Sequence, residues 1–243
     1  MSRIFDALEN RDIDARKAGT IEQMLPQVET ALDYPSGMEK EMNTLYQVIT
    51  TVLPDRQRRS VLFVGARPNE GTSTIARELA KTASSQLGKR VLLIDCEGRS
   101  CEEFVYRAVD ASVKLEDILE NKTSVDKVVC SVNGSSLSVL PFYKWADSPA
   151  VRMSYNENGH GFWNALNERF ELVIVDYPQE MLTNGPVMTS KVDGVIIVVE
   201  AEKTRWQVAS NLKEKIIKNG GNILGVVFNK RQHYIPQFIY DRL

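Results

Sequence analysis

The chain is short of several residue types, and each shortage excludes a class of protein. Its 243 residues include three cysteines and two histidines. Cys96 and Cys101 are too widely spaced for a CxxC motif, so the pattern favours neither a zinc site nor a disulfide-stapled secreted domain. Its longest purely apolar run, "VIIVV" at residues 195–199, falls far below the roughly 20 residues that span a bilayer. We therefore expect a reduced, cytoplasmic compartment, with the protein reaching the inner membrane only peripherally, through a partner.

An excess of charge is also missing. The formal net charge is -2 and the isoelectric point about 5.9. Nucleic-acid-binding domains carry a strongly basic surface, so no nucleic acid is expected as a partner. The hydrophobic content of 43% is enough to bury the core of one α/β domain.

Apolar, β-branched runs alternate with segments of helical period. Strands are predicted at 60–66, 90–95, 171–176, 193–201 and 222–229, with a weaker one at 136–141. Helices are predicted at 73–87, 160–170 and 204–219, with a weaker one at 114–121. The five main runs do not alternate polar with apolar residues, so each is predicted to be buried on both faces. This order predicts an α/β fold, a mostly parallel twisted sheet with helices on both faces.

The chain divides into two unequal parts. Residues 1–37 are predicted to be a short N-terminal helix and a linker, and residues 38–243 one domain with a C-terminal tail. Within "SRIFDALEN", Ile4, Phe5 and Leu8 share one side of the short helix. That side docks either on the chain's own domain or on another protein, and the sequence leaves both open.

The stretch "GARPNEGTST" at 65–74 follows a strand and opens a helix, the setting of a phosphate-binding loop. Its backbone N–H groups and the helix N-terminus favour an anion, and a serine hydroxyl there can reach Mg²⁺. A Walker A loop reads G-x-x-x-x-G-K-[ST], whereas this chain has Ala66, four residues, Gly71, Thr72 and Ser73. Losing the lysine charge typically costs about a hundredfold in rate.

Two carboxylates follow predicted strands. Asp95 ends "VLLID" and Asp176 ends "LVIVD". The carboxyl ends of parallel strands face the crevice where open sheets bind ligands. Together with the loop, the two aspartates favour a site of nucleotide-binding ancestry.

These motifs resemble those of the cytoplasmic domain of bacterial tyrosine kinases from capsule and exopolysaccharide loci, P-loop proteins related to the MinD/ParA ATPases. The family reads approximately P-G-E-G-K-S-T, L-L-I-D-A-D-L-R and I-I-D-T-P-P. The corresponding segments here are "PNEGTST" (68–74), "LLIDCEGR" (92–99) and "VIVDYP" (173–178). The resemblance covers roughly residues 36–230.

The resemblance implies a site for ATP or ADP with Mg²⁺. Gly71, Ser73 and Thr74 would line the phosphates, and Asn229 would lie near the base. Ser73, Asp95 and Asp176 would serve Mg²⁺, and the two aspartates would be the catalytic groups if the protein is active. The wider set of predicted nucleotide-binding residues is Ala66, Arg67, Asn69, Glu70, Gly71, Thr72, Ser73, Thr74 and Asn229.

The sequence also departs from the family. Thr72 replaces the catalytic lysine and Glu97 an aspartate. The family's oligomerisation helix carries arginines, whereas its counterpart at 38–52 has none. The resemblance implies a homo-oligomer, but the missing arginines argue against the family's ring assembly. The family ends in a tyrosine-dense tail, but only Tyr234 and Tyr240 stand here as candidate phosphoacceptors. The apolar residues of this tail favour packing.

Two arginines are candidates for the missing charge. Arg67 occupies the position of the MinD/ParA signature lysine, which contacts phosphates across a dimer, and an exposed loop arginine is the simpler interpretation. Arg99 matches a family arginine, with solvated charge as the default. The basic cluster "NKRQH" at 229–233 is interpreted as framing the nucleotide crevice.

Three functions are compatible with these features, and the first is favoured. The first is a degenerate tyrosine-kinase-like subunit, regulatory or scaffolding, of a machine for polysaccharide polymerisation and export. Its expected partner is a Wzz-like membrane polysaccharide co-polymerase or another export component, contacted in part by "SRIFDAL". The second is an active ATP-dependent tyrosine autokinase, and the third a MinD/ParA-type positioning ATPase.

Overall fold

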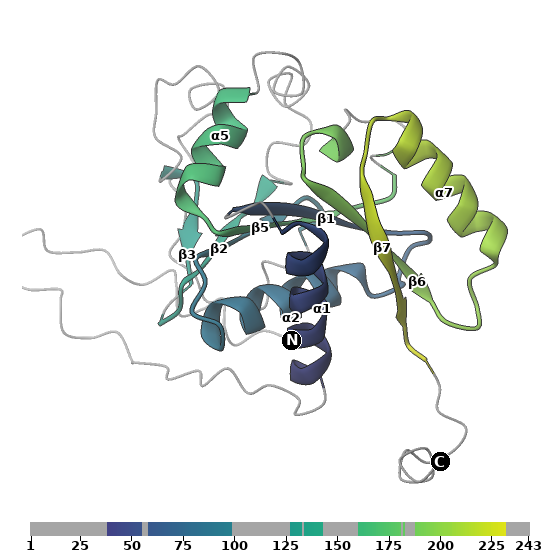
Figure 1. Cartoon of the computed structure of the whole chain (residues 1–243), viewed down its shortest axis with the longest axis horizontal. Coiled ribbons are helices and arrows are strands. Elements are labelled where there is room, and N and C mark those ends of the chain that lie inside the picture. Colours follow the sequence, from purple (N-terminus) through teal and green to yellow (C-terminus); the bar gives the residue numbers. More distant parts are fainter. Residues whose placement is uncertain are drawn as a thin grey trace, which may run out of the picture. The chain divides into compact units, whose positions relative to one another are not determined.

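The computed structural model describes residues 38–54, 58–98, 127–132, 134–142, 160–180, 182 and 188–231. Their elements, in chain order, are α1 (Glu39–Val52), β1 (Arg59–Gly65), α2 (Thr72–Ser85), β2 (Val91–Asp95), β3 (Cys130–Ser131), β4 (Leu137–Leu140), α5 (His160–Arg169), β5 (Leu172–Tyr177), η4 (Met188–Ser190), β6 (Gly194–Glu200), α7 (Trp206–Lys218) and β7 (Ile223–Asn229) (Figure 1).

Several predictions fall outside these residues and stay predictions. They concern the N-terminal part at 1–37, the helix at 114–121, Arg99, and the tail tyrosines Tyr234 and Tyr240. The boundary between an N-terminal segment and a main domain is likewise untested.

The strands form one sheet of seven, in the order β3-β4-β2-β5-β1-β6-β7. All neighbours are parallel except β3 and β4, which pair antiparallel. The predicted α/β fold with a mostly parallel sheet is confirmed. The sequence did not indicate β3, because two residues are too few to show a period.

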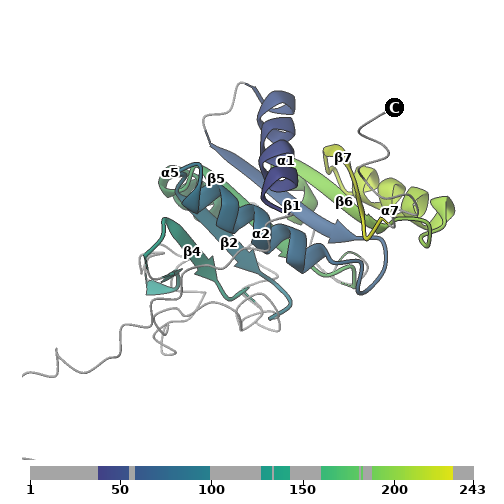
Figure 2. The ribbon, with the colours of Figure 1, turned by 90° about the horizontal axis from the view of Figure 1, so that it is seen from below.

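Alternate residues of each central strand enter two different cores. In β1, Val61 and Phe63 pack with α1 and α2, whereas Leu62 and Val64 pack with α5 and α7. Figure 2 shows α1 and α2 lying together against one face of the sheet. Since both faces are covered, the central strands can be apolar throughout. The prediction of helices on both faces is confirmed.

The prediction of full burial is wrong for the run at 222–229. It forms β7, the last strand in the order, and none of its residues is fully buried. Val226 is 44% and Phe228 69% exposed. Among the strands that the structure describes, β7 has a neighbour on one side only. The sequence pattern of an apolar strand does not reveal its place in the order.

The order of strands brings three chain segments together at the carboxyl ends of the central strands. β1 lies between β5 and β6, and β2 lies beside β5. Asp95 and Asp176 are direct partners in the β2–β5 register. The carboxyl ends of these strands and the loop after β1 therefore meet, as open α/β sheets require of a ligand site.

Candidate functional site

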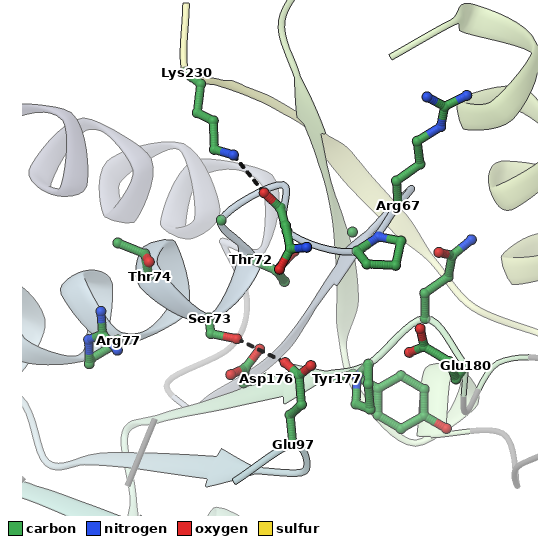
Figure 3. Close-up of a pocket in the computed structure, with 16 residues that line it drawn as sticks. Arg67, Thr72, Ser73, Thr74, Arg77, Glu97, Asp176, Tyr177, Glu180 and Lys230 are labelled. Atoms are coloured by element: carbon green, nitrogen blue, oxygen red, sulfur yellow. Dashed lines mark hydrogen bonds between the residues drawn. The ribbon is translucent and has the colours of Figure 1, made fainter. Parts of the chain in front are cut away.

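A cleft of about 420 Å³ lies at the carboxyl ends of β1, β2 and β5 (Figure 3). The loop between β1 and α2 forms one wall, and residues after β2, β5 and β7 form the others. The lining residues are Gly65, Arg67, Pro68, Asn69, Gly71, Thr72, Ser73, Thr74, Arg77, Glu97, Asp176, Tyr177, Pro178, Gln179, Glu180 and Lys230. Most of the predicted nucleotide-binding residues are therefore brought together.

The loop adopts backbone angles that suit an anion cradle. Asn69 has a φ of 64° and Gly71 a φ of 87°, both left-handed, with Glu70 between them. Alternation of this kind turns successive backbone N–H groups toward one side, as in known phosphate-binding concavities. Gly71 also directly precedes α2, so the helix N-terminus adds its partial positive charge.

Three of the predicted nucleotide-binding residues, Ala66, Glu70 and Asn229, do not line the cleft. The side-chain amide of Asn229 donates to the carbonyl of Glu70. Ala66 is fully buried, and its N–H donates to the carbonyl of Val198 at 3.0 Å. Glu70 is 2% exposed. Ala66 and Glu70 therefore support the loop from its buried side.

The buried carboxylate of Glu70 connects the loop to the end of β6. Its Oε2 accepts the N–H of Arg67 at 2.8 Å. Its Oε1 accepts the N–H of Glu200 at 3.3 Å and the hydroxyl of Thr204. Three neutral donors thus satisfy a buried anion, which would otherwise be costly.

Thr72 takes the place of the Walker A lysine and its side chain stays close to the strand. A Cβ built on Gly65 would lie 2.8 Å from Oγ1 of Thr72, so the hydroxyl packs against the end of β1. A threonine hydroxyl is the second atom of its side chain, whereas the lysine ammonium is the fifth. Thr72 therefore brings neither the reach nor the charge of the lysine.

Three oxygen-bearing side chains line the cleft where a magnesium ion is predicted. The hydroxyl of Ser73 donates to Oε2 of Glu97 at 3.3 Å, and Asp176 lies beside them (Figure 3). Mg²⁺ prefers hard oxygen ligands, commonly one or two carboxylates together with phosphate oxygens. This donor set fits Mg²⁺ delivered with a nucleotide. Among the described residues, no three His, Cys, Asp or Glu side chains could hold a metal on their own.

Asp95 has a different place from the one predicted. It is fully buried and does not line the cleft. Its Oδ1 accepts the N–H groups of Glu97 and Gly98 at 3.0 and 2.7 Å. Asp95 thus shapes the turn that presents Glu97, and Glu97 is the carboxylate that the cleft receives from this turn.

Cations line the cleft from three elements. Arg67 belongs to the loop, Arg77 follows one helical turn after Ser73 in α2, and Lys230 directly follows β7. In Figure 3 the guanidinium of Arg67 points away from Ser73 and Asp176. Arg67 and the cluster containing Lys230 were predicted from the sequence. Arg77 was not, although its i+4 spacing from Ser73 places both on one helix face.

Tyr177 directly follows Asp176, at the threonine position of the motif that this segment resembles. It lines the cleft although the residue is almost fully buried. Burial raises the pKa of its phenol, and the nearby Cys96 adds to the shift. The phenol is therefore neutral and can serve the cleft only as a hydrogen-bonding group.

No protein-family model matches the chain, but individual proteins do. Tyrosine-protein kinase YwqD of Bacillus subtilis is 28% identical over 204 residues, which cover 83% of this chain and 85% of the relative. Tyrosine-protein kinase CpsD of Streptococcus agalactiae is 24% identical over 177 residues, 72% of this chain and 76% of the relative. The homologues of this chain are bacterial tyrosine-protein kinases. The resemblance predicted from the motifs is thereby confirmed.

Solved structures place the fold. The kinase domain of Escherichia coli tyrosine kinase ETK matches with a TM-score of 0.63 and 18% identity, over 82% of this chain and 79% of that one. The MinD cell division protein of Aquifex aeolicus matches with a TM-score of 0.52 and 21% identity, over 76% and 72%. These likenesses confirm the P-loop NTPase-like fold. Within the described residues, no helix combines the length and apolar character needed to cross a bilayer.

Proposed function

We propose that this protein is a tyrosine-kinase-like, nucleotide-binding subunit of exopolysaccharide or capsule biosynthesis and export, with a regulatory or scaffolding role and weak or no phosphoryl transfer. One observation carries the proposal. The loop keeps the backbone form of an anion cradle. Thr72, which stands in the lysine position, has a short uncharged side chain that packs against Gly65.

The retained loop backbone and the missing lysine affect binding and catalysis differently. Backbone N–H groups and a helix N-terminus attract phosphate without the lysine. Phosphoryl transfer needs a positive charge placed against the oxygens on which negative charge accumulates. Loss of this charge lowers the rate by about a hundredfold or more. The protein can therefore retain nucleotide binding while its turnover falls.

Titration calorimetry with Mg-ADP and Mg-ATP tests the proposal, comparing the wild-type chain with Thr72→Lys. We expect measurable wild-type binding and tighter binding by the variant, because the scaffold is intact and only the charge is missing. The variant should also gain ATP turnover. Absence of binding by both proteins would show that the loop is no longer a nucleotide site.

An active tyrosine autokinase is the second candidate, and one feature favours it. Arg67, Arg77 and Lys230 all line the cleft, so the chain offers cations from outside the lysine position. Incubation with Mg-ATP followed by detection of phosphotyrosine separates the two proposals. A strong signal that is lost in Asp176→Ala and reduced in Tyr234→Phe/Tyr240→Phe would establish the kinase and reject the inactive subunit.

A MinD/ParA-type positioning ATPase is the third candidate. It would form a dimer in solution only when ATP is bound. Light scattering with and without Mg-ATP tests this, and a nucleotide-dependent dimer would favour it over both kinase-like proposals.

For the partner, we propose the cytoplasmic end of a Wzz-like membrane polysaccharide co-polymerase, which would hold the protein peripherally at the inner membrane. The support is the resemblance together with the short apolar side that the sequence predicts for Ile4, Phe5 and Leu8. Deleting residues 1–9 should abolish co-purification with the membrane protein, whereas a chain shortened at 235–243 should retain it. Equal recovery of the N-terminally shortened and full chains would reject this contact.

A further inference from the structure

Two consecutive residues at the end of β7 hold two consecutive carbonyl groups of the phosphate loop. The side-chain amide of Asn229 donates to the carbonyl of Glu70 at 2.7 Å. The ammonium of Lys230 donates to the carbonyl of Asn69 at 2.6 Å (Figure 3). The loop is therefore bonded to the end of β7, although the bonded residues are separated by 159 and 161 positions in the sequence.

These two bonds fix the direction of the loop amides. In a trans peptide, the carbonyl of one residue and the N–H of the next point in opposite directions. With the carbonyls of Asn69 and Glu70 drawn toward β7, the N–H groups of Glu70 and Gly71 point to the other side of the loop. In Figure 3, Lys230 approaches the loop from the side opposite Ser73 and Asp176.

The ammonium also brings charge to a loop that has Thr72 in the Walker A lysine position. Lys230 pairs with one oxygen of Glu200 at 3.3 Å, and Lys203 pairs with the other at 3.1 Å. Of these groups, only the ammonium of Lys230 also bonds to the loop, at the carbonyl of Asn69. A cation bound to a carbonyl polarises its peptide group and strengthens the N–H on the opposite side as a donor.

We propose that Lys230 is the positioning cation of the phosphate loop. Acting through the peptide between Asn69 and Glu70, it aims the loop amides at the polyphosphate end of a nucleotide and supplies part of the positive potential that Thr72 cannot. This assignment rests on the proposed nucleotide site. It makes Lys230 a positioning residue that acts through its bond to the loop.

The chain offers a matched control. Lys203 and Lys230 share the carboxylate of Glu200, but only Lys230 bonds to the loop. Lys230→Met keeps a long apolar stem and removes the charge and the donor. Lys203→Met removes an equal charge from the same carboxylate, and Lys230→Arg restores a cation with donors.

The experiment is calorimetry on the full chain with inorganic diphosphate, Mg-ADP and adenosine. We expect Lys230→Met to weaken diphosphate and Mg-ADP binding by about tenfold, the usual scale of one lost hydrogen bond to a charged group. Adenosine binding should stay unchanged, Lys203→Met should change each affinity less than twofold, and Lys230→Arg should recover most of the loss. Equal losses for the two methionine variants, unchanged diphosphate binding, or a matching loss of adenosine would each overturn the assignment.

A double-mutant cycle separates failure of the assignment from failure of the site. In the Thr72→Lys background, Lys230→Met should cost less than in the wild type, because the restored lysine supplies the charge directly. If the wild type binds no phosphate but Thr72→Lys does, the nucleotide proposal fails for the natural chain, and a loss on adding Lys230→Met still supports the assignment. If neither background binds diphosphate, or the losses in both are identical, the assignment is rejected.

Discussion

A side chain on Gly71 would meet Asn229: a Cβ built on the glycine lies 2.2 Å from Nδ2 of the asparagine. The contact joins the phosphate loop to the end of β7 and leaves space for hydrogen only. Gly71 is therefore required twice, by this approach and by its φ of 87°.

Gly71→Ala should weaken Mg-ADP binding by more than about tenfold, since the loop must move away from Asn229 and the left-handed angle costs ~1–2 kcal/mol. Gly88→Ala is the control, because Gly88 also has a positive φ, 61°, but has nothing within 4 Å of its Cβ position. That variant should lose stability by the strain alone and bind nucleotide normally. Equal binding by the two variants would contradict the role of the contact.

Glu70→Gln should lower the free energy of unfolding by about 1–3 kcal/mol, because an amide nitrogen would face one of the donors that the carboxylate now accepts. Nucleotide affinity should fall with it, since Arg67, Glu200 and Thr204 would no longer be held by one group. Urea unfolding and calorimetry measure the two effects. Glu214→Gln, at an exposed position of α7, should change neither.

Arg67→Ala tests whether Arg67 contacts a nucleotide bound by a second copy. Its guanidinium points away from Ser73 and Asp176 in Figure 3, so we expect a loss of affinity only at protein concentrations where the chain dimerises. Calorimetry at two protein concentrations measures this, with Arg58→Ala as the control at an exposed position. Unchanged affinity at both concentrations removes the hypothesis.

Glu171 should make stability depend on acid pH. The backbone N–H of Arg90 chiefly holds the pKa of its carboxyl below the usual range, burial opposes this, and Lys89 supports it at 3.1 Å. Because the folded pKa is lowered, the stabilisation is present above the unfolded pKa of about 4.3 and is lost as pH falls through the folded pKa. Its size is at most about 1 kcal/mol, since the side chain is 30% exposed.

The measurement is urea unfolding of the wild type and Glu171→Gln between pH 7 and pH 3. The two curves should differ at neutral pH and converge in acid. Glu168→Gln, at an exposed position of α5, should match the wild type throughout. A constant difference between wild type and Glu171→Gln across the range would show that the charge is not responsible.

Trp163 and Trp206 give a test of the core. Trp163 is 5% exposed and packs edge-on against Phe162 with ring centroids 5.8 Å apart, whereas Trp206 is 73% exposed. Trp163→Ala should lower the free energy of unfolding by about 3–5 kcal/mol. Trp206→Ala should change it by less than about 0.5 kcal/mol. Similar losses from both variants would contradict the packing described for α5.

The local pattern of the sequence determined the elements of this fold. Apolar β-branched runs and helical periodicity each act over a few residues, so strands such as 60–66 and the glycine-bounded helix near 204–219 could be predicted to within two residues of their ends. The strand–loop–helix setting and the order of motifs were likewise local, and they led to the kinase-like family and to most of the cleft. The change from lysine to Thr72 is visible in the letters alone.

Only the tertiary structure decided which side chains meet at the cleft. Asp95 and Glu97 are two residues apart, yet the turn after β2 buries the first and presents the second. The exposure of β7 and the bond from Lys230 to Asn69 depend on strand order, which brings together residues separated by 161 positions. No periodicity encodes such contacts, because they form only when distant segments pack into one sheet.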